Sequence, residues 1–133
     1  VQDMEERMRQ TRGLSWGPIT DEQWHHMAEH NARALEDGNI TYSYDPGIAK
    51  IFETEPTGDT DLWPYWSNIQ APVQILHGLQ SLILTQPIID TMQQKYTGSI
   101  ISLTQFADCG HVPSLMAPNQ IEAVREWLIN TQI

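Results

Sequence analysis

Hydrophobic positions in the first half of the chain follow the helical period. Thr20 and Gln23 form a capping-box pattern, in which each side chain can bond the backbone N–H of the other residue, and the pattern predicts a helix over about 21–36. Gly38 suits the left-handed conformation that ends many helices. The face expected to be buried consists of Trp24, Met27, Ala28, Asn31 and Leu35.

The rest of the first half is expected to contain one more helix and two irregular segments. Residues 2–11 are expected to be helical, and residues 12–18, which include glycine and proline, to form a loop. Segment 53–61 is rich in turn-forming and charged residues and has no apolar period. It predicts a surface connection between two halves of the chain, and no long strand is expected before it.

The second half alternates between strand and helix periods. A buried strand is predicted over residues 72–77, a helix over 85–96 and a second strand over 99–106. A final helix is expected to start at Asn119, which forms a capping-box pattern with Glu122. The helical faces expected to be buried are Ile88, Ile89, Met92 and Tyr96 in the first helix, and Ile121, Val124, Trp127 and Leu128 in the second.

This order of strand, helix, strand and helix is typical of an α/β fold with a parallel sheet. A right-handed crossover brings the carboxyl ends of both strands to one edge of the sheet, where ligand sites of open α/β sheets lie. Two parallel strands need apolar cover on both faces and seldom form a stable sheet alone. The chain also begins with Val1 in a charged stretch without a strand, so we expect a fragment or one half of a larger fold.

Composition and charge limit the possible partners. The chain has 133 residues, of which 40% are hydrophobic, and this fits one ordinary folded domain. Its formal net charge of −10 argues against nucleic acid or an anionic membrane as a partner, because both select clustered Lys and Arg. Its apolar runs are far shorter than the roughly 20 residues of a membrane span. We therefore expect a soluble, cytoplasmic protein, and the single Cys109 excludes a disulfide framework.

A candidate catalytic residue follows the second predicted strand. Residues 106–115 contain a tight glycine-containing turn that places His111 at the carboxyl edge of the sheet. Histidine is the side chain best suited to proton transfer near neutral pH. From the residues alone, a loop histidine without a task is an equally good interpretation.

Three segments, residues 61–78, 110–115 and 126–128, resemble the C-terminal part of an α/β-hydrolase. In that family a phrase of the type W-x-x-I-x-x-P-x-x-x-L-x-G leads into the strand whose end carries the catalytic acid, and G-H-x-P carries the catalytic histidine; both patterns occur here in that order. Segments 17–24 and 44–49 resemble the helical lid that the family inserts before this point. The resemblance implies a lid or cap region over residues 1–62 and the C-terminal part of the core over 63–133.

The resemblance also implies chemistry. It makes His111 the general base of a hydrolase that needs no cofactor. Two departures from the family pattern matter. The nucleophile elbow G-x-S-x-G, which lies upstream of the lid in the family, occurs nowhere in this sequence. The phrase after the acid-bearing strand is usually G-x-x-S-D, and Leu82 stands at the position of the acid. Asp90 lies inside a predicted helix and Asp108 just before the histidine turn, so neither matches the motif.

Two functions follow from this pattern. The first is a partial α/β-hydrolase that, in its complete form, hydrolyses ester-type or related carbonyl substrates with a nucleophile outside this chain. Its partners would be a small-molecule substrate and a missing upstream part of the fold or a second copy, and the chain alone is expected to be inactive. The alternative is a non-catalytic binding module that has lost the catalytic acid, and Leu82 favours it. A nucleophile elbow in a longer sequence would favour the enzyme.

A different candidate site lies in the first half. The segment from His26 to His30 matches the H-x-x-E-H pattern of inverted zinc peptidases, with the two histidines one helical turn apart. No third ligand is evident, so a solvated helix flank is the favoured interpretation and no bound metal is expected. His25 is expected to face outward, and His77 to be a hydrogen-bonded residue at a strand end.

An aromatic group follows the predicted connection. Trp63, Tyr65 and Trp66 could line a substrate cleft between lid and core, since such clefts are mainly apolar. Packing between structural layers is the favoured alternative.

Overall fold

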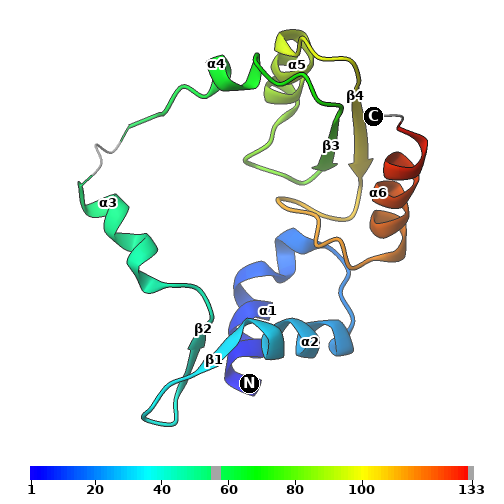
Figure 1. Ribbon diagram of the computed structural model, residues 1–133. Coiled ribbons are helices and arrows are strands. Elements are labelled where there is room, and N and C mark those ends of the chain that lie inside the picture. The colour runs from blue at the N-terminus through cyan, green and yellow to red at the C-terminus, as the bar shows by residue number, and fades with distance from the viewer. Residues whose placement is uncertain (55–57, 132–133) are drawn as a thin grey trace.

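The computed structural model describes residues 1–54 and 58–131 (Figure 1). The elements follow one another along the chain as α1 (Gln2–Trp16), α2 (Asp21–Asn31), β1 (Ala32–Ala34), β2 (Ile40–Tyr42), the 3-10 helix η1 (Pro46–Lys50), α3 (Ile51–Thr54), α4 (Trp63–Trp66), β3 (Val73–Gly78), α5 (Gln86–Lys95), β4 (Ile101–Phe106) and α6 (Pro118–Asn130). The regular elements described in the first half are thus helices and one short hairpin, joined by loops, whereas strands and helices alternate in the second half. No helix among these residues is long and apolar enough to cross a membrane.

Helices α1 and α2 pack against each other around a small apolar cluster. Met4 and Met8 of α1 and Trp24 and Ala28 of α2 are all buried. Trp16, at the end of α1, stacks on Trp24 with 5.8 Å between the ring centroids. This packing explains why α1 continues to Trp16 and the loop predicted over 12–18 is wrong for its first five residues: tertiary contacts outweigh the low helix propensity of glycine.

The capping box at the start of α2 is confirmed. The backbone N–H of Gln23 donates to Oγ1 of Thr20 at 3.2 Å, and the N–H of Thr20 donates to Oε1 of Gln23 at 3.0 Å. Each bond gives a partner to a backbone N–H that has none within the helix. The start of this helix therefore follows from two residues.

The predicted end of that helix is wrong. Helix α2 stops at Asn31, and the chain continues into an antiparallel hairpin in which Ala32 pairs with Tyr42. Gly38 has φ of +83°, but it lies in the hairpin turn and caps no helix. Leu35 lies beyond the helix and is exposed, and so is Asn31. The β-branched and aromatic residues of β2, preceded by a turn-forming segment, favour a hairpin over a further helical turn.

Strands β3 and β4 form the predicted parallel sheet, with paired residues running from Val73 and Ile101 to Gly78 and Phe106. Helices α5 and α6 lie against opposite faces of this sheet. Gln74 donates through Nε2 to the carbonyl of Ala123 in α6 at 3.2 Å. On the other face, Gln105 donates to Nδ1 of His77 at 3.1 Å and to Oε1 of Gln86 at the start of α5 at 3.4 Å. The α/β architecture expected from the sequence is confirmed.

The two C-terminal helices differ from the prediction in which faces they bury. In α5, Ile89 is fully buried as expected, but Ile88 is exposed. Helix α6 starts at Pro118 rather than by an Asn119 cap, because the fixed φ of proline suits the first helical position. The buried face of α6 is rotated from the expected one: Gln120 is buried, whereas Ile121 and Leu128 are exposed.

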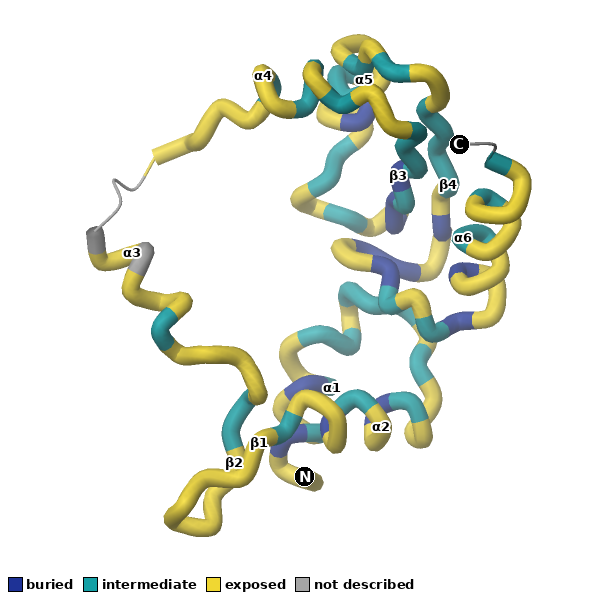
Figure 2. Tube along the Cα trace, in the orientation of Figure 1, coloured by how far each residue is buried: buried dark blue, intermediate teal, exposed yellow. Residues whose placement is uncertain are grey.

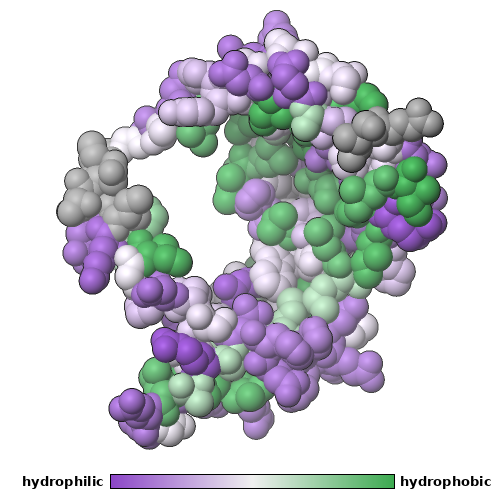
Figure 3. Space-filling model, in the orientation of Figure 1, coloured by the Kyte–Doolittle hydropathy of each residue, from purple (hydrophilic) through white to green (hydrophobic). Residues whose placement is uncertain are grey.

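The segment between β2 and α4 is exposed along almost all of its described length (Figure 2). Residues 53 and 58–61 of the predicted surface connection are exposed, as expected, while residues 55–57 lie outside the described residues. Hydrophobic side chains instead gather in the middle of the molecule, around the sheet and the loops that follow its strands (Figure 3). The candidate site lies among these loops.

Candidate functional site

The loop after β4 carries His111 and lies directly against the turn after β3. The backbone N–H of Leu79 donates to the carbonyl of Phe106 at 2.8 Å, and the N–H of Gln80 donates to the carbonyl of Cys109 at 3.0 Å. The side-chain amide of Gln80 adds a bond to the carbonyl of Ala107 at 3.1 Å. The two strand ends therefore meet at one edge of the sheet, as the parallel crossover predicts.

Gly78, the last residue of β3, makes this close approach possible. A Cβ atom at position 78 would lie 2.1 Å from the carbonyl oxygen of Gly110 and 2.6 Å from that of Cys109. Both distances are far below van der Waals contact, and both neighbours are backbone atoms, which cannot rotate away. The glycine of the strand motif is thus required by the position of the histidine loop.

The N-terminal helices hold the same loop from its other side. The N–H of Gly110 donates to the carbonyl of Ser15 at 2.7 Å, and the side-chain amide of Gln23 donates to the carbonyl of Met116 at 2.8 Å. Gly17, with φ of +86°, lets α1 end against Cys109, since a Cβ at position 17 would be 2.8 Å from the Cβ of Cys109. Segments far apart in the sequence therefore define the backbone of the histidine loop.

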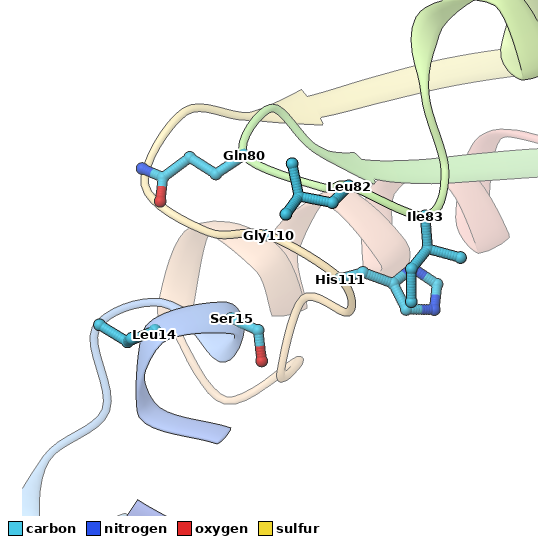
Figure 4. A pocket seen from close by; sticks show the side chains of 7 residues that line it. All are labelled: Leu14, Ser15, Gln80, Leu82, Ile83, Gly110 and His111. Atoms are coloured by element: carbon cyan, nitrogen blue, oxygen red, sulfur yellow. The ribbon is translucent and has the colours of Figure 1, made fainter. Parts of the chain in front are cut away.

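A pocket of about 270 Å³ lies between these three segments (Figure 4). The lining residues come from the end of α1, the turn after β3 and the loop after β4: Leu14, Ser15, Gln80, Leu82, Ile83, Gly110 and His111. None of these residues carries a permanent charge. The side chains of Leu14 and Leu82 are almost fully exposed, at 95% and 92%. The described part of the pocket is therefore an uncharged, mainly apolar surface in which His111 is the titratable side chain.

No carboxylate among the described residues lines this pocket. Leu82, at the motif position of the acid, lies in the pocket wall together with His111. Asp90 is exposed on α5, where it accepts a bond from Gln86 at 2.8 Å, and Asp108 is exposed just before the turn. Within residues 1–54 and 58–131, nothing hydrogen-bonds the imidazole of His111. The ring therefore has no partner here that would fix its tautomer.

Two side chains near His111 are unsuited to act as its nucleophile. The hydroxyl of Ser15 donates to the carbonyl of Arg12 at 3.1 Å, so its proton is engaged within α1. Cys109 is a free and fully buried cysteine. Burial raises the pKa of its thiol, and the nearby charge of Asp108 raises it further, so the reactive thiolate is disfavoured.

The histidine pair of α2 lies on one face of the helix, with ring centroids of His26 and His30 4.1 Å apart. Nδ1 of His30 is 2.8 Å from the carbonyl oxygen of His26, so this nitrogen takes part in a backbone contact. In the described part of the chain, no three His, Cys, Asp or Glu side chains are grouped to hold a metal ion. His25 is exposed beside Glu5 of α1, with Nδ1 3.3 Å from Oε2. His77 is hydrogen-bonded near the end of β3, as predicted, and its side chain is buried.

The aromatic group of α4 packs against α5. Trp66 donates through Nε1 to the carbonyl of Met92 at 2.9 Å, and the ammonium of Lys95 lies 5.8 Å from the ring centroid of Trp63. Tyr65 is exposed. None of the three aromatic residues is part of the pocket wall beside His111. The packing interpretation is the one that these contacts support.

Sequence reasoning identified His111 and the turn around Leu82 but missed other residues of the site. Leu14 and Ser15 carry no motif and are far from His111 in sequence, so no local signal marks them. Gln120 contacts the histidine loop from α6, and its position next to the predicted apolar stripe gave no sign of burial. Only the three-dimensional arrangement brings these residues together.

A parallel sheet covered on both faces, with a histidine turn at its carboxyl edge, is the arrangement found in the C-terminal part of α/β-hydrolases. No family model matches the sequence. The chain is 31% identical over 123 residues to the 3-hydroxybutyrate-oligomer hydrolase of Cupriavidus necator, and the match covers 84% of this chain and 40% of that protein.

Several solved structures have a backbone fold similar to that of this chain. A Rickettsia typhi protein classed as a hydrolase has 26% identity and a TM-score of 0.83, over 98% of this chain and 43% of that one. An α/β hydrolase from Novosphingobium aromaticivorans has 24% identity and a TM-score of 0.73, over 97% and 45%. An esterase of M. tuberculosis has 22% identity and a TM-score of 0.67, over 97% and 41%. The chain has the fold of the C-terminal part of an α/β-hydrolase, and it spans less than half the length of these relatives.

Proposed function

We propose that this chain is the C-terminal part of a hydrolase of ester-type or related carbonyl substrates, with His111 as general base and the nucleophile outside the chain. The observation that carries this is the position of His111 in a pocket at the carboxyl edge of the sheet, facing the turn after β3. The relative from C. necator, a 3-hydroxybutyrate-oligomer hydrolase, and the structural likeness to an esterase support the substrate class.

In this mechanism His111 takes the proton of the nucleophile as it attacks the carbonyl and then returns a proton to the leaving group. Hydrogen-bond donors outside this chain would stabilise the negative charge that develops on the carbonyl oxygen. The wall formed by Leu14, Leu82 and Ile83 suits an uncharged acyl or alcohol group, because none of these side chains can pair with a charge.

We further propose that the partner of this chain is the upstream part of the same fold, with a second copy of the chain as the alternative. Large apolar side chains around the site are exposed and have no cover among the described residues, namely Leu14, Leu79, Leu82, Ile83 and Val112. Exposed apolar side chains gathered around one site favour burial against another protein surface. In this proposal residues 1–62 form the lid region and residues 63–133 the end of the core.

A second candidate function is a non-catalytic binding module. The specific observation in its favour is Leu82, which places an aliphatic side chain where the family pattern has a carboxylate. An imidazole without an acidic partner is a weaker base in the triad, because neither its tautomer nor its protonated form is stabilised. The two functions differ in a measurable way, since only the enzyme turns over a substrate.

The experiment compares turnover of short-chain aryl esters by the complete protein that contains this chain and by its His111→Ala variant. Removal of the general base is expected to lower kcat by about 1,000-fold or more. His26→Ala, which removes an exposed histidine on α2, serves as the matched control and should leave kcat unchanged. Equal turnover by the wild-type and His111→Ala proteins would overturn the general-base role of His111, whereas no turnover by either protein would favour the binding module.

A further inference from the structure

Gln120 is a fully buried polar residue on α6 that contacts both flanks of the histidine turn. Its Oε1 accepts bonds from the backbone N–H of Leu115 at 2.8 Å and from the hydroxyl of Ser114 at 3.3 Å. Its Nε2 faces Sγ of Cys109 at 3.9 Å, within the range of a weak bond to sulfur. One amide thus joins the residues before and after His111.

The backbone of the turn has few other supports. Gly110 is held by the carbonyl of Ser15, but within the described residues the backbone groups of His111, Val112 and Pro113 form no hydrogen bond with other backbone groups. The next backbone group held in place is the N–H of Leu115, and its partner is Gln120. His111 therefore lies in a short span fixed only at its two ends.

The conformation of Leu115 increases the need for this support. Its φ of +58° lies in the left-handed region, which residues with a Cβ atom rarely adopt. Such a conformation persists where surrounding contacts impose it. The bond from Leu115 to Gln120 is the contact that acts directly on this residue's backbone.

The chemistry of the position agrees with a role in the turn. A buried amide without partners would be strongly unfavourable, whereas an aliphatic residue would fill the same volume at no such cost. Both polar atoms of Gln120 face the loop after β4 and neither faces the sheet. The amide of Gln120 is thus directed at the segment that carries His111.

We propose that Gln120 is a positioning residue, which holds the histidine turn so that the imidazole of His111 meets the nucleophile; its catalytic consequence rests on the function proposed above. Loss of the amide would free the C-terminal flank of the turn. A displacement of about 1 Å at a catalytic group can lower the rate by about 100-fold. Substrate binding would change little, because Gln120 is not part of the pocket wall.

The test uses the complete protein with Gln120→Met, which keeps side-chain length but removes the amide. Gln74→Met is the matched control: Gln74 also bonds α6, through the carbonyl of Ala123, and makes no contact with the turn. We expect Gln120→Met to lower kcat by about 10- to 100-fold with KM near wild type, and to speed hydrogen exchange at the Leu115 amide. Gln74→Met should lower Tm without either effect.

Gln120→Glu keeps an oxygen at the position of Oε1 and should be closer to wild type in both measurements than Gln120→Met. If Gln120→Met does not fold, hydrogen exchange at the Leu115 amide of the wild-type protein decides, because exchange as fast as that of an unprotected amide would overturn the proposal. Wild-type kcat together with unchanged exchange at Leu115 overturns the proposal, and so does an equal loss in the Gln74→Met control. If His111→Ala retains full turnover, the proposed function fails, while exchange at Leu115 still decides whether Gln120 fixes the turn.

Discussion

Gly78→Ala is the substitution whose effect follows most directly from the geometry of the site. The added Cβ would lie 2.1 Å from the carbonyl oxygen of Gly110. A carbon and an oxygen in ordinary contact are about 3.3 Å apart, so the histidine loop or the end of β3 must move by about 1.2 Å. The same Cβ would also lie 2.6 Å from the carbonyl oxygen of Cys109, so a movement that relieves only the contact with Gly110 would not be sufficient.

This displacement has two measurable consequences. Overpacking of a close backbone contact costs about 1 to 3 kcal/mol of folding free energy. The bond between Gln80 and the carbonyl of Cys109, now 3.0 Å, would lengthen or break. Under the function proposed above, a shift of this size at His111 would lower kcat of the complete protein by about 100-fold. Stability and activity should therefore fall together, with activity falling further than unfolding alone explains.

Urea unfolding and ester turnover measure the two effects. Gly58→Ala is the matched control, because no atom of the described residues lies within 4 Å of a Cβ at that position and its stability change should stay within about 0.5 kcal/mol. A Gly78→Ala protein with the stability and kcat of wild type would refute the reasoning, since it would mean that the two loops do not meet at this edge of the sheet.

Three further predictions concern other parts of the chain. Gly13→Ala should raise the free energy of unfolding by about 0.5 to 1 kcal/mol, because the residue lies within α1 and its nearest non-local atom is 4.0 Å from the new Cβ; a loss of stability in urea would contradict the helix at this point. Leu82→Asp should leave ester turnover by the complete protein unchanged or raise it, by giving His111 an acidic partner in the pocket; a large loss would indicate that the acid comes from elsewhere. The hydrogen bond from Arg9 holds the pKa of Glu5 below its ordinary value of 4.5, so the stability that the Glu5–Arg9 pair provides is present above that pH and is lost as the pH falls through the lower native pKa. Glu5→Gln should therefore weaken the loss of unfolding free energy at acid pH, and an unchanged dependence of unfolding free energy on pH would argue against the pair.

The second half of the fold could be predicted because its signals are local. The strand over 72–77, the helix over 85–96 and the strand over 99–106 each lie within two residues of the observed element at either end. Their alternation determines a parallel pairing, and the pairing brings His111 to the turn around Leu82. Sequence periodicity was sufficient here because each element is short and bounded by turn-forming residues.

Two of the errors, the end of α1 and the buried face of α6, share a physical cause, which is packing between segments distant in sequence. Helix α1 extends to Trp16 because that ring stacks on Trp24, a contact that no window around Gly13 contains. The buried face of α6 is centred near Gln120 because the histidine loop supplies polar partners for a buried amide. An apolar stripe predicts which helix face is buried only where the opposing surface is apolar. The histidine loop instead presents a backbone N–H and a hydroxyl to the start of α6.

The way the histidine loop is held has a consequence for the order of folding. The bond between Gln23 and Met116 joins residues 93 positions apart, and Ser15 binds Gly110 across a similar distance in sequence. Closing so long a loop has an entropic cost before any contact forms, whereas the pair α1 and α2 is assembled from residues close in sequence. The helical pair and the β3 to β4 crossover can therefore form early and separately. We therefore expect the turn that carries His111 to take up its final backbone conformation only when these two units meet.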